Sequence, residues 1–192
     1  MDAVELVYDY FEDRAHASAL IRQRRPAGLG LAGILLGAAS LYVAQSLAGR
    51  GMMPFGWPGF ALSLLWQVVL TFVATALLHL ILELGGARGD ARALFVHMGL
   101  SELVWMAAAP LIMISQVAFS KPAWSLRIIF FALGLWSLSY KARGIRDEYG
   151  ISGGRAWLTL GLPYLAGVLV VLLIAFLATL GLVLSALSSW GR

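Results

Sequence analysis

The longest uninterrupted apolar run of the chain covers residues 156–187 and contains no charged residue. A helix needs about 20 apolar residues to cross the hydrocarbon of a bilayer, at about 1.5 Å rise per residue. Four further apolar runs lie at 28–48, 60–82, 100–119 and 126–140. Hydrophobic residues make up 60% of the chain and charged residues only 12%, which is about half the share typical of a soluble domain. The sequence therefore predicts an all-α, polytopic membrane helix bundle with five transmembrane helices.

Several classes of protein are excluded by the same composition. A chain of 192 residues cannot hide this much apolar surface in one soluble core. It contains no cysteine, which excludes disulfides, thiol catalysis and iron–sulfur ligation. The net charge of +4 is divided among short segments beside the apolar runs, so we expect no nucleic-acid partner. No nucleophile elbow, phosphate loop or catalytic triad is visible, so we expect neither enzymatic activity nor a cofactor.

The basic residues between the runs predict the orientation of the chain. With the N-terminus in the cytoplasm and five spans, the C-terminus lies outside, and ten of the fourteen basic residues lie inside. This is the asymmetry of the positive-inside rule, and it predicts a multi-pass protein of the cell inner membrane. The four basic residues left outside are Arg50, Lys121, Arg127 and Arg192. Pro163 is expected to divide the last run into an interfacial turn and the true span.

Residues 1–27 are predicted to form a separate cytoplasmic segment ahead of a membrane domain at 28–187. Val4, Tyr8 and Phe11 recur at helical spacing, which indicates a short amphipathic helix. A basic cluster precedes the first span: Arg22, Arg24 and Arg25. These arginines either contact anionic lipid headgroups or only fix the topology, and we favour the second role.

Ionisable side chains near the inner ends of spans two and three are candidate binding residues, because charge is costly in hydrocarbon. His79 and Glu83 share one face of span two, and His97 and Glu102 open span three. Together they form a hypothetical site for a divalent metal or a proton relay, although no metal signature is matched, so we predict no metal. The simpler interpretation is that the carboxylates pair with nearby arginines: Arg88, Arg92 or Arg155.

Polar and small residues also mark two of the spans. Gln67, Thr71 and Thr75 follow one another at intervals of four along span two and line either a helix contact or a polar cavity. Gly33 and Gly37 permit close helix approach in span one, within the chain or between two copies.

Two segments, 77–110 and 140–165, carry a family resemblance. In the first, a span ending in His79 is followed by Gly85-Gly86, a short polar turn and a span that reaches Pro110. In the second, basic residues end a span and a Gly-Ile-Ser turn leads into Gly-Arg-Ala. With five spans and a cytoplasmic N-terminus, the chain resembles the prokaryotic branch of the Yip family of small membrane proteins. The remaining residues that match this pattern are Gly144, Gly150, Arg155, Ala156 and Pro163. Most of the matching residues are expected to be structural, and His79 and Arg155 are the two that are also candidate binding residues.

The resemblance implies a five-helix bundle. Eukaryotic Yip proteins bind Rab-type GTPases in vesicle traffic, but their acidic cytoplasmic region is much longer than the segment here. The first function hypothesis is therefore a non-enzymatic protein of membrane organisation, acting through a membrane or cytoplasmic protein partner or as a homo-oligomer. The alternative is a small-molecule, ion or lipid transporter or channel, with a polar path past five residues: Gln67, Thr71, His79, Glu83 and Glu102. A polar cavity along span two would favour the alternative, and a tightly packed bundle the first hypothesis.

Overall fold

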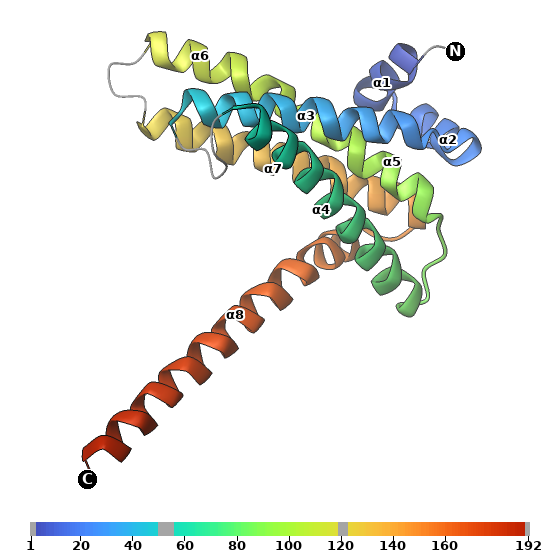
Figure 1. Ribbon diagram of the computed structural model, residues 1–192. Helices are drawn as coiled ribbons and strands as arrows, with labels where there is room; N and C mark the ends of the chain where they lie inside the picture. The colour runs from blue at the N-terminus through green and yellow to red at the C-terminus, as the bar shows by residue number, and fades with distance from the viewer. Residues whose placement is uncertain (1–2, 50–55, 119–122, 191–192) are drawn as a thin grey trace.

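The computed structural model describes residues 3–49, 56–118 and 123–190, and every regular element in these ranges is a helix (Figure 1). The prediction of an all-α chain is confirmed. In chain order the elements are α1 (Ala3–Glu12), α2 (Arg14–Arg24), α3 (Ala27–Leu47), α4 (Trp57–Leu84), α5 (Ala91–Ser101), the 3₁₀ helix η1 (Glu102–Ala107), α6 (Ala108–Ala118), α7 (Ala123–Tyr149) and α8 (Gly153–Trp190).

Four of the described helical stretches are long and apolar enough to cross a membrane. They are Ala27–Leu47, Trp57–Leu84, Ala91–Ala118 and Gly153–Leu182. The predicted fourth span, 126–140, lies within α7 and is not among them, because charged residues follow its short apolar stretch directly. Of the four basic residues predicted outside, Arg127 is the second residue of this stretch. Arg50, Lys121 and Arg192 lie outside the described residues, as does position 119 at the end of the predicted third span.

The first two helices pack against the bundle and do not form a detached segment. Asp13 caps the start of α2, where its side chain accepts a hydrogen bond from the backbone N–H of His16 at 3.2 Å. α1 buries Leu6 and Tyr10, and the Tyr10 hydroxyl donates to the carbonyl oxygen of His97 at 3.1 Å. The Arg14 guanidinium lies 4.2 Å from the ring centre of Tyr140 in α7. The N-terminal hairpin therefore covers one end of α5 and α7.

Glycines bring α3 against α5 and η1 almost backbone to backbone. A Cβ atom added to Gly33 would lie 2.5 Å from the carbonyl oxygen of Gly99, and one added to Gly37 would overlap the carbonyl oxygen of Glu102. Any larger side chain would push the helices apart. The close approach that the sequence permits is therefore made within the chain.

The third membrane-length stretch changes from α-helix to 3₁₀ helix in its middle, one turn before a proline. Pro110 has no N–H, so the carbonyl group of Met106 lacks its usual helical donor. The hydroxyl of Ser40 in α3 donates to this carbonyl oxygen instead, at 3.1 Å. A freed backbone group inside a membrane helix is thus satisfied by a neighbouring helix, as the absence of water in a bilayer requires.

The last two helices differ in how they meet the bundle. α7 ends at Tyr149, and Gly150 follows with φ +62°, a left-handed conformation that suits glycine. α8 buries Ala156 and Leu160 and then leaves the bundle, running through Pro163 as one continuous helix (Figure 1). Pro163, which is expected to divide the last run, therefore does not break the helix.

Candidate ligand pocket

A buried ion pair lies where η1 begins. The Nζ atom of Lys141 in α7 is 2.6 Å from Oε1 of Glu102, and the two side chains are 17% and 2% exposed. The sequence predicts that Glu102 pairs with an arginine. The structure corrects this prediction, because the partner of Glu102 is a lysine. The direction of a side chain on α7 depends on the rotation of that helix, which apolar periodicity does not fix for a helix contacted on several faces.

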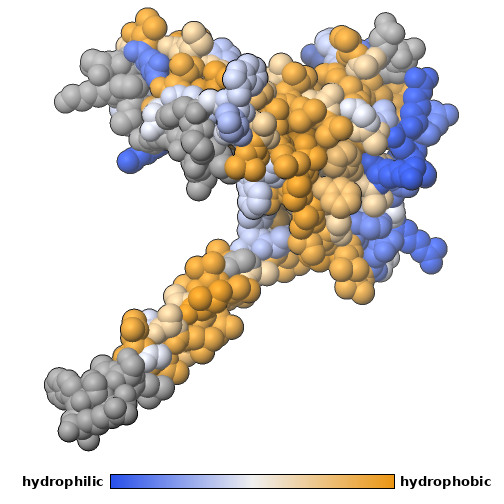
Figure 2. Space-filling model, in the orientation of Figure 1, coloured by the Kyte–Doolittle hydropathy of each residue, from blue (hydrophilic) through white to orange (hydrophobic). Residues whose placement is uncertain are grey.

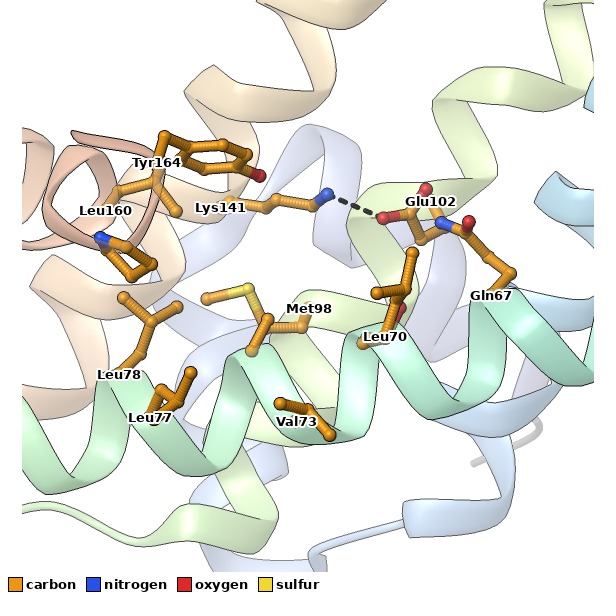
Figure 3. A pocket seen from close by; sticks show the side chains of 13 residues that line it. Gln67, Leu70, Val73, Leu77, Leu78, Met98, Glu102, Lys141, Leu160 and Tyr164 are labelled. Carbon is orange, nitrogen blue, oxygen red and sulfur yellow. Dashed lines mark ion pairs between the residues drawn. The ribbon is translucent and has the colours of Figure 1, made fainter. Parts of the chain in front are cut away.

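This ion pair lies in the wall of a pocket of about 330 Å³ between α4, α5, α7 and α8 (Figure 3). Pockets that bind small molecules start at about this size. Figure 3 shows Lys141 crossing one side of the pocket toward Glu102, with Gln67 beside Glu102. The apolar lining comes from Leu70, Val73, Ala74, Leu77, Leu78, Met98, Leu160 and Pro163, and the remaining lining residues are Thr71 and Tyr164.

The rim of the pocket belongs to the apolar outer surface of the molecule. Leu70, Val73 and Leu77 of α4 are large exposed hydrophobic residues, and so is Tyr164 of α8. Apolar side chains cover α8 and much of the visible bundle surface, whereas hydrophilic residues gather at the end that carries α2 and the start of α5 (Figure 2). The pocket thus opens sideways, on the surface that hydrocarbon would cover in a bilayer.

The residues predicted as binding candidates separate into distinct places. Gln67 and Glu102 line the pocket together, whereas His79 and Glu83 pair with each other at 3.4 Å away from its lining. His97 is buried under Tyr10 on the other side of α5, and neither of its ring nitrogens has a hydrogen-bond partner among the described residues. Over the described ranges, His, Asp and Glu side chains form no group of three that could hold a metal ion.

His79 takes its partners from two directions. The Tyr149 hydroxyl lies 2.5 Å from its Nδ1 atom, and the Glu83 carboxylate faces its Nε2 atom. Burial, followed by the charges of Glu148 and Glu83, raises the pKa of Tyr149 above its ordinary value, so the hydroxyl keeps its proton. Both ring nitrogens of His79 therefore have a polar partner within the chain. The arrangement joins the ends of α4 and α7, which is a structural role.

The predicted arginines mostly have partners within the chain. Arg155 donates to the carbonyl oxygen of Gly85 at the end of α4. Arg22 pairs with Glu148 at 3.1 Å and Arg25 with Asp90 at 3.2 Å, whereas Arg24 is exposed. Lys141 is a pocket residue that the sequence does not predict. The signal that could have found it is its separation of 39 residues from Glu102, at matching depth in neighbouring antiparallel helices.

No family model matches the chain, and searches of curated proteins and of solved structures give no match either. The resemblance to the Yip family remains a prediction from the two short segments that carry it.

Proposed function

We propose that this chain is a non-enzymatic integral membrane protein that binds an amphipathic molecule of the bilayer in its lateral pocket. The observation that carries the proposal is a buried ion pair in the wall of an otherwise apolar cavity that opens on the hydrocarbon-facing surface. The proposal includes five spans, a cytoplasmic N-terminus and an inner-membrane location, which rest on the distribution of basic residues along the sequence.

The chemistry of the lining specifies the ligand. Its apolar walls suit an alkyl chain, since apolar contact gains about 25 cal/mol per Å² removed from water. Glu102 is almost fully covered, whereas Lys141 keeps part of its surface and has ammonium protons beyond the one directed at Glu102. A ligand head that accepts hydrogen bonds therefore fits, such as a carboxylate, phosphate or ester oxygen.

A binding pocket is favoured over a continuous conduit. A conduit past span two would need a polar path that includes His79 and Glu83, but these two residues pair with each other away from the pocket lining. The polar residues of the lining are few, and they gather at one side. This arrangement suits a ligand that enters from the bilayer and is held by its head.

The test is a pair of tryptophan substitutions on α4. Ala74 lines the pocket, whereas Ala76 is exposed on another face of the same helix. We expect Ala74→Trp to fill the cavity and to lower the affinity for palmitate at least tenfold, measured by native mass spectrometry of the protein in detergent micelles. Ala76→Trp is the matched control and is expected to bind palmitate like the parent.

Two outcomes would contradict the proposal. One is a parent protein that retains neither palmitate nor a lysophospholipid; the other is an equal loss of affinity in both tryptophan variants. Liposome flux assays complete the test. If the protein transports ions or lipid faster than empty vesicles do, and Ala74→Trp abolishes this transport, the protein is a conduit rather than a binding protein.

A second candidate function is membrane organisation through a partner, as the Yip resemblance implies, and it is favoured by α8. The stretch Gly153–Leu182 is the most apolar of the four membrane-length stretches, yet none of its most apolar 18-residue segment is buried within the chain. A second copy of the chain or another membrane protein could pack against it. Because the chain has no cysteine, single cysteines report this contact directly. Disulfide dimers of Val171→Cys in α8, without dimers of the equally exposed Phe72→Cys in α4, would support self-association.

A further inference from the structure

A second, charged cleft lies at the hydrophilic end of the bundle, away from the lateral pocket. It has a volume of about 530 Å³ and lies between the end of α2, the turn that precedes α5 and the end of α7. Its charged lining consists of three arginines and two acids, namely Arg22, Arg25, Arg88, Asp90 and Glu148. The lining charge is thus positive by one unit, although both signs are present.

The acidic groups are used within the chain. Oε2 of Glu148 accepts from Nε of Arg22 at 3.1 Å, and its Oε1 accepts from the backbone N–H of Asp90 at 3.0 Å. The Glu148 side chain is only 4% exposed. Asp90 caps α5, accepting from the backbone N–H groups of Arg92 and Ala93, and it also pairs with Arg25. Few acceptor positions therefore remain open toward the cleft.

The arginines, by contrast, keep donors to spare. A guanidinium carries five N–H donors. Arg22 uses its Nε and Nη2 atoms, and Arg25 uses Nη2, while both side chains are half exposed. Arg88 is exposed and makes no hydrogen bond or ion pair with the part of the chain that the structure describes. Unused donors from α2 and from the turn before α5 thus face one cleft.

We propose that this cleft binds a phosphate group. A surplus of guanidinium donors with the local acceptors already occupied calls for a ligand that brings several anionic oxygens, and arginine matches phosphate in two-point geometry. Arg22 and Arg25 are held in place by Glu148 and Asp90, so part of the site is preorganised. Arg88, which lines the cleft and is exposed, supplies the third cation. The phosphate belongs either to a lipid headgroup at the membrane surface or to a soluble molecule.

The test compares two exposed arginines whose side chains make no hydrogen bond or ion pair with the described residues. Arg88 lines the cleft, whereas Arg92 lies four residues away and does not. We expect Arg88→Gln to weaken phosphate binding about tenfold, the effect of losing one charge-assisted contact of about 1.4 kcal/mol. Arg92→Gln is expected to bind like the parent. Neither substitution removes a described contact, and circular dichroism verifies that both variants are folded.

Two probes distinguish the sources of the phosphate. Native mass spectrometry in micelles measures retention of phosphatidic acid against phosphatidylcholine, and calorimetry measures binding of inorganic phosphate. Loss of phosphatidic acid in Arg88→Gln alone supports a lipid headgroup, whereas loss of inorganic phosphate binding in Arg88→Gln alone supports a soluble ligand. The proposal is overturned if the parent binds neither probe, or if Arg92→Gln weakens binding as much as Arg88→Gln does.

Discussion

α5 and α8 belong to stretches of membrane length, yet they have opposite surroundings. α5 is buried along nearly its whole length, between α3, α4, α7 and the N-terminal hairpin. Half of the most apolar 18-residue segment of Ala91–Ala118 is buried within the chain. In Gly153–Leu182, none of the corresponding segment is buried. The buried stretch nonetheless contains His97, Ser101 and Glu102, whereas the uncovered one consists mainly of leucine, valine and alanine.

The difference shows which surfaces of a membrane protein the hydropathy of its sequence identifies. In water, the most apolar helix would form the core. In a bilayer, lipid tails solvate leucine as well as a protein interior does, so helices associate through small residues and polar contacts. Gly33 against Gly99, and Glu102 with Lys141, are contacts of this kind. Hydropathy therefore identifies the lipid-facing surface, and glycine and polar residues identify the helix contacts.

The largest expected effect comes from the buried ion pair. Lys141→Met leaves the Glu102 carboxylate buried without its cation, and removal of one partner of such a pair costs about 3–5 kcal/mol. We expect the free energy of unfolding to fall by this amount in a denaturing-detergent titration followed by circular dichroism. Glu102→Gln combined with Lys141→Met removes both charges and is expected to recover most of the loss. A single variant as stable as the parent would refute the pairing.

A second comparison truncates one apolar side chain at a buried position and one at an exposed position. Ile112 in α6 is fully buried, so Ile112→Ala is expected to cost about 2–5 kcal/mol. Leu172 in α8 is exposed, and Leu172→Ala is expected to change stability by less than about 0.5 kcal/mol. The same titration measures both variants. Equal losses would mean that α8 is covered by protein, which would support self-association.

Replacing a glycine by alanine is expected to change stability less, and in opposite directions in α3 and in α8. Gly33→Ala places a methyl group against the Gly99 carbonyl, and overpacking of this kind costs about 1–3 kcal/mol. Gly161 in α8 has open space around its Cβ position, so Gly161→Ala is expected to be neutral or to stabilise by up to about 1 kcal/mol. Thermal unfolding in detergent micelles ranks the stability of the parent and the two glycine variants. Destabilisation by Gly161→Ala would indicate an unseen close contact.

The smallest effect concerns the hairpin that covers α5. Tyr10→Phe removes the hydrogen bond to His97 and is expected to cost about 0.5–1.5 kcal/mol at neutral pH. Burial, opposed by Arg14, raises the pKa of Tyr10 above its ordinary value near 10. Its contribution is therefore complete below about pH 10 and is lost as pH rises further, because only the unfolded chain then releases the proton.

Unfolding titrations at about pH 8 and about pH 11 measure this dependence. The parent is expected to lose more stability between the two than Tyr10→Phe does. Tyr8→Phe, on the exposed face of the same helix, is the control. An unchanged slope in Tyr10→Phe would contradict the burial of the hydroxyl group.

The sequence predicted part of the candidate site. Gln67 and Glu102 are predicted as binding residues because they are polar residues within apolar runs, and both line the pocket. Lys141 was missed because it follows the fourth apolar run, where a basic residue usually marks the membrane boundary. His79 and His97 share a predicted membrane level, yet Tyr149 engages one and Tyr10 covers the other.

What the sequence by itself determined is the set of helices and their apolar faces, because the length and composition of each run depend on that run alone. The all-α class and four membrane-length stretches followed from this local information. The tertiary structure decided which side chains meet, such as Lys141 with Glu102 and Arg22 with Glu148. Among its described side chains, α8 buries residues only in its first turns. Such contacts depend on how each helix is rotated and tilted. Lipid and protein interior are nearly equal solvents for an apolar face, so hydropathy does not determine that rotation.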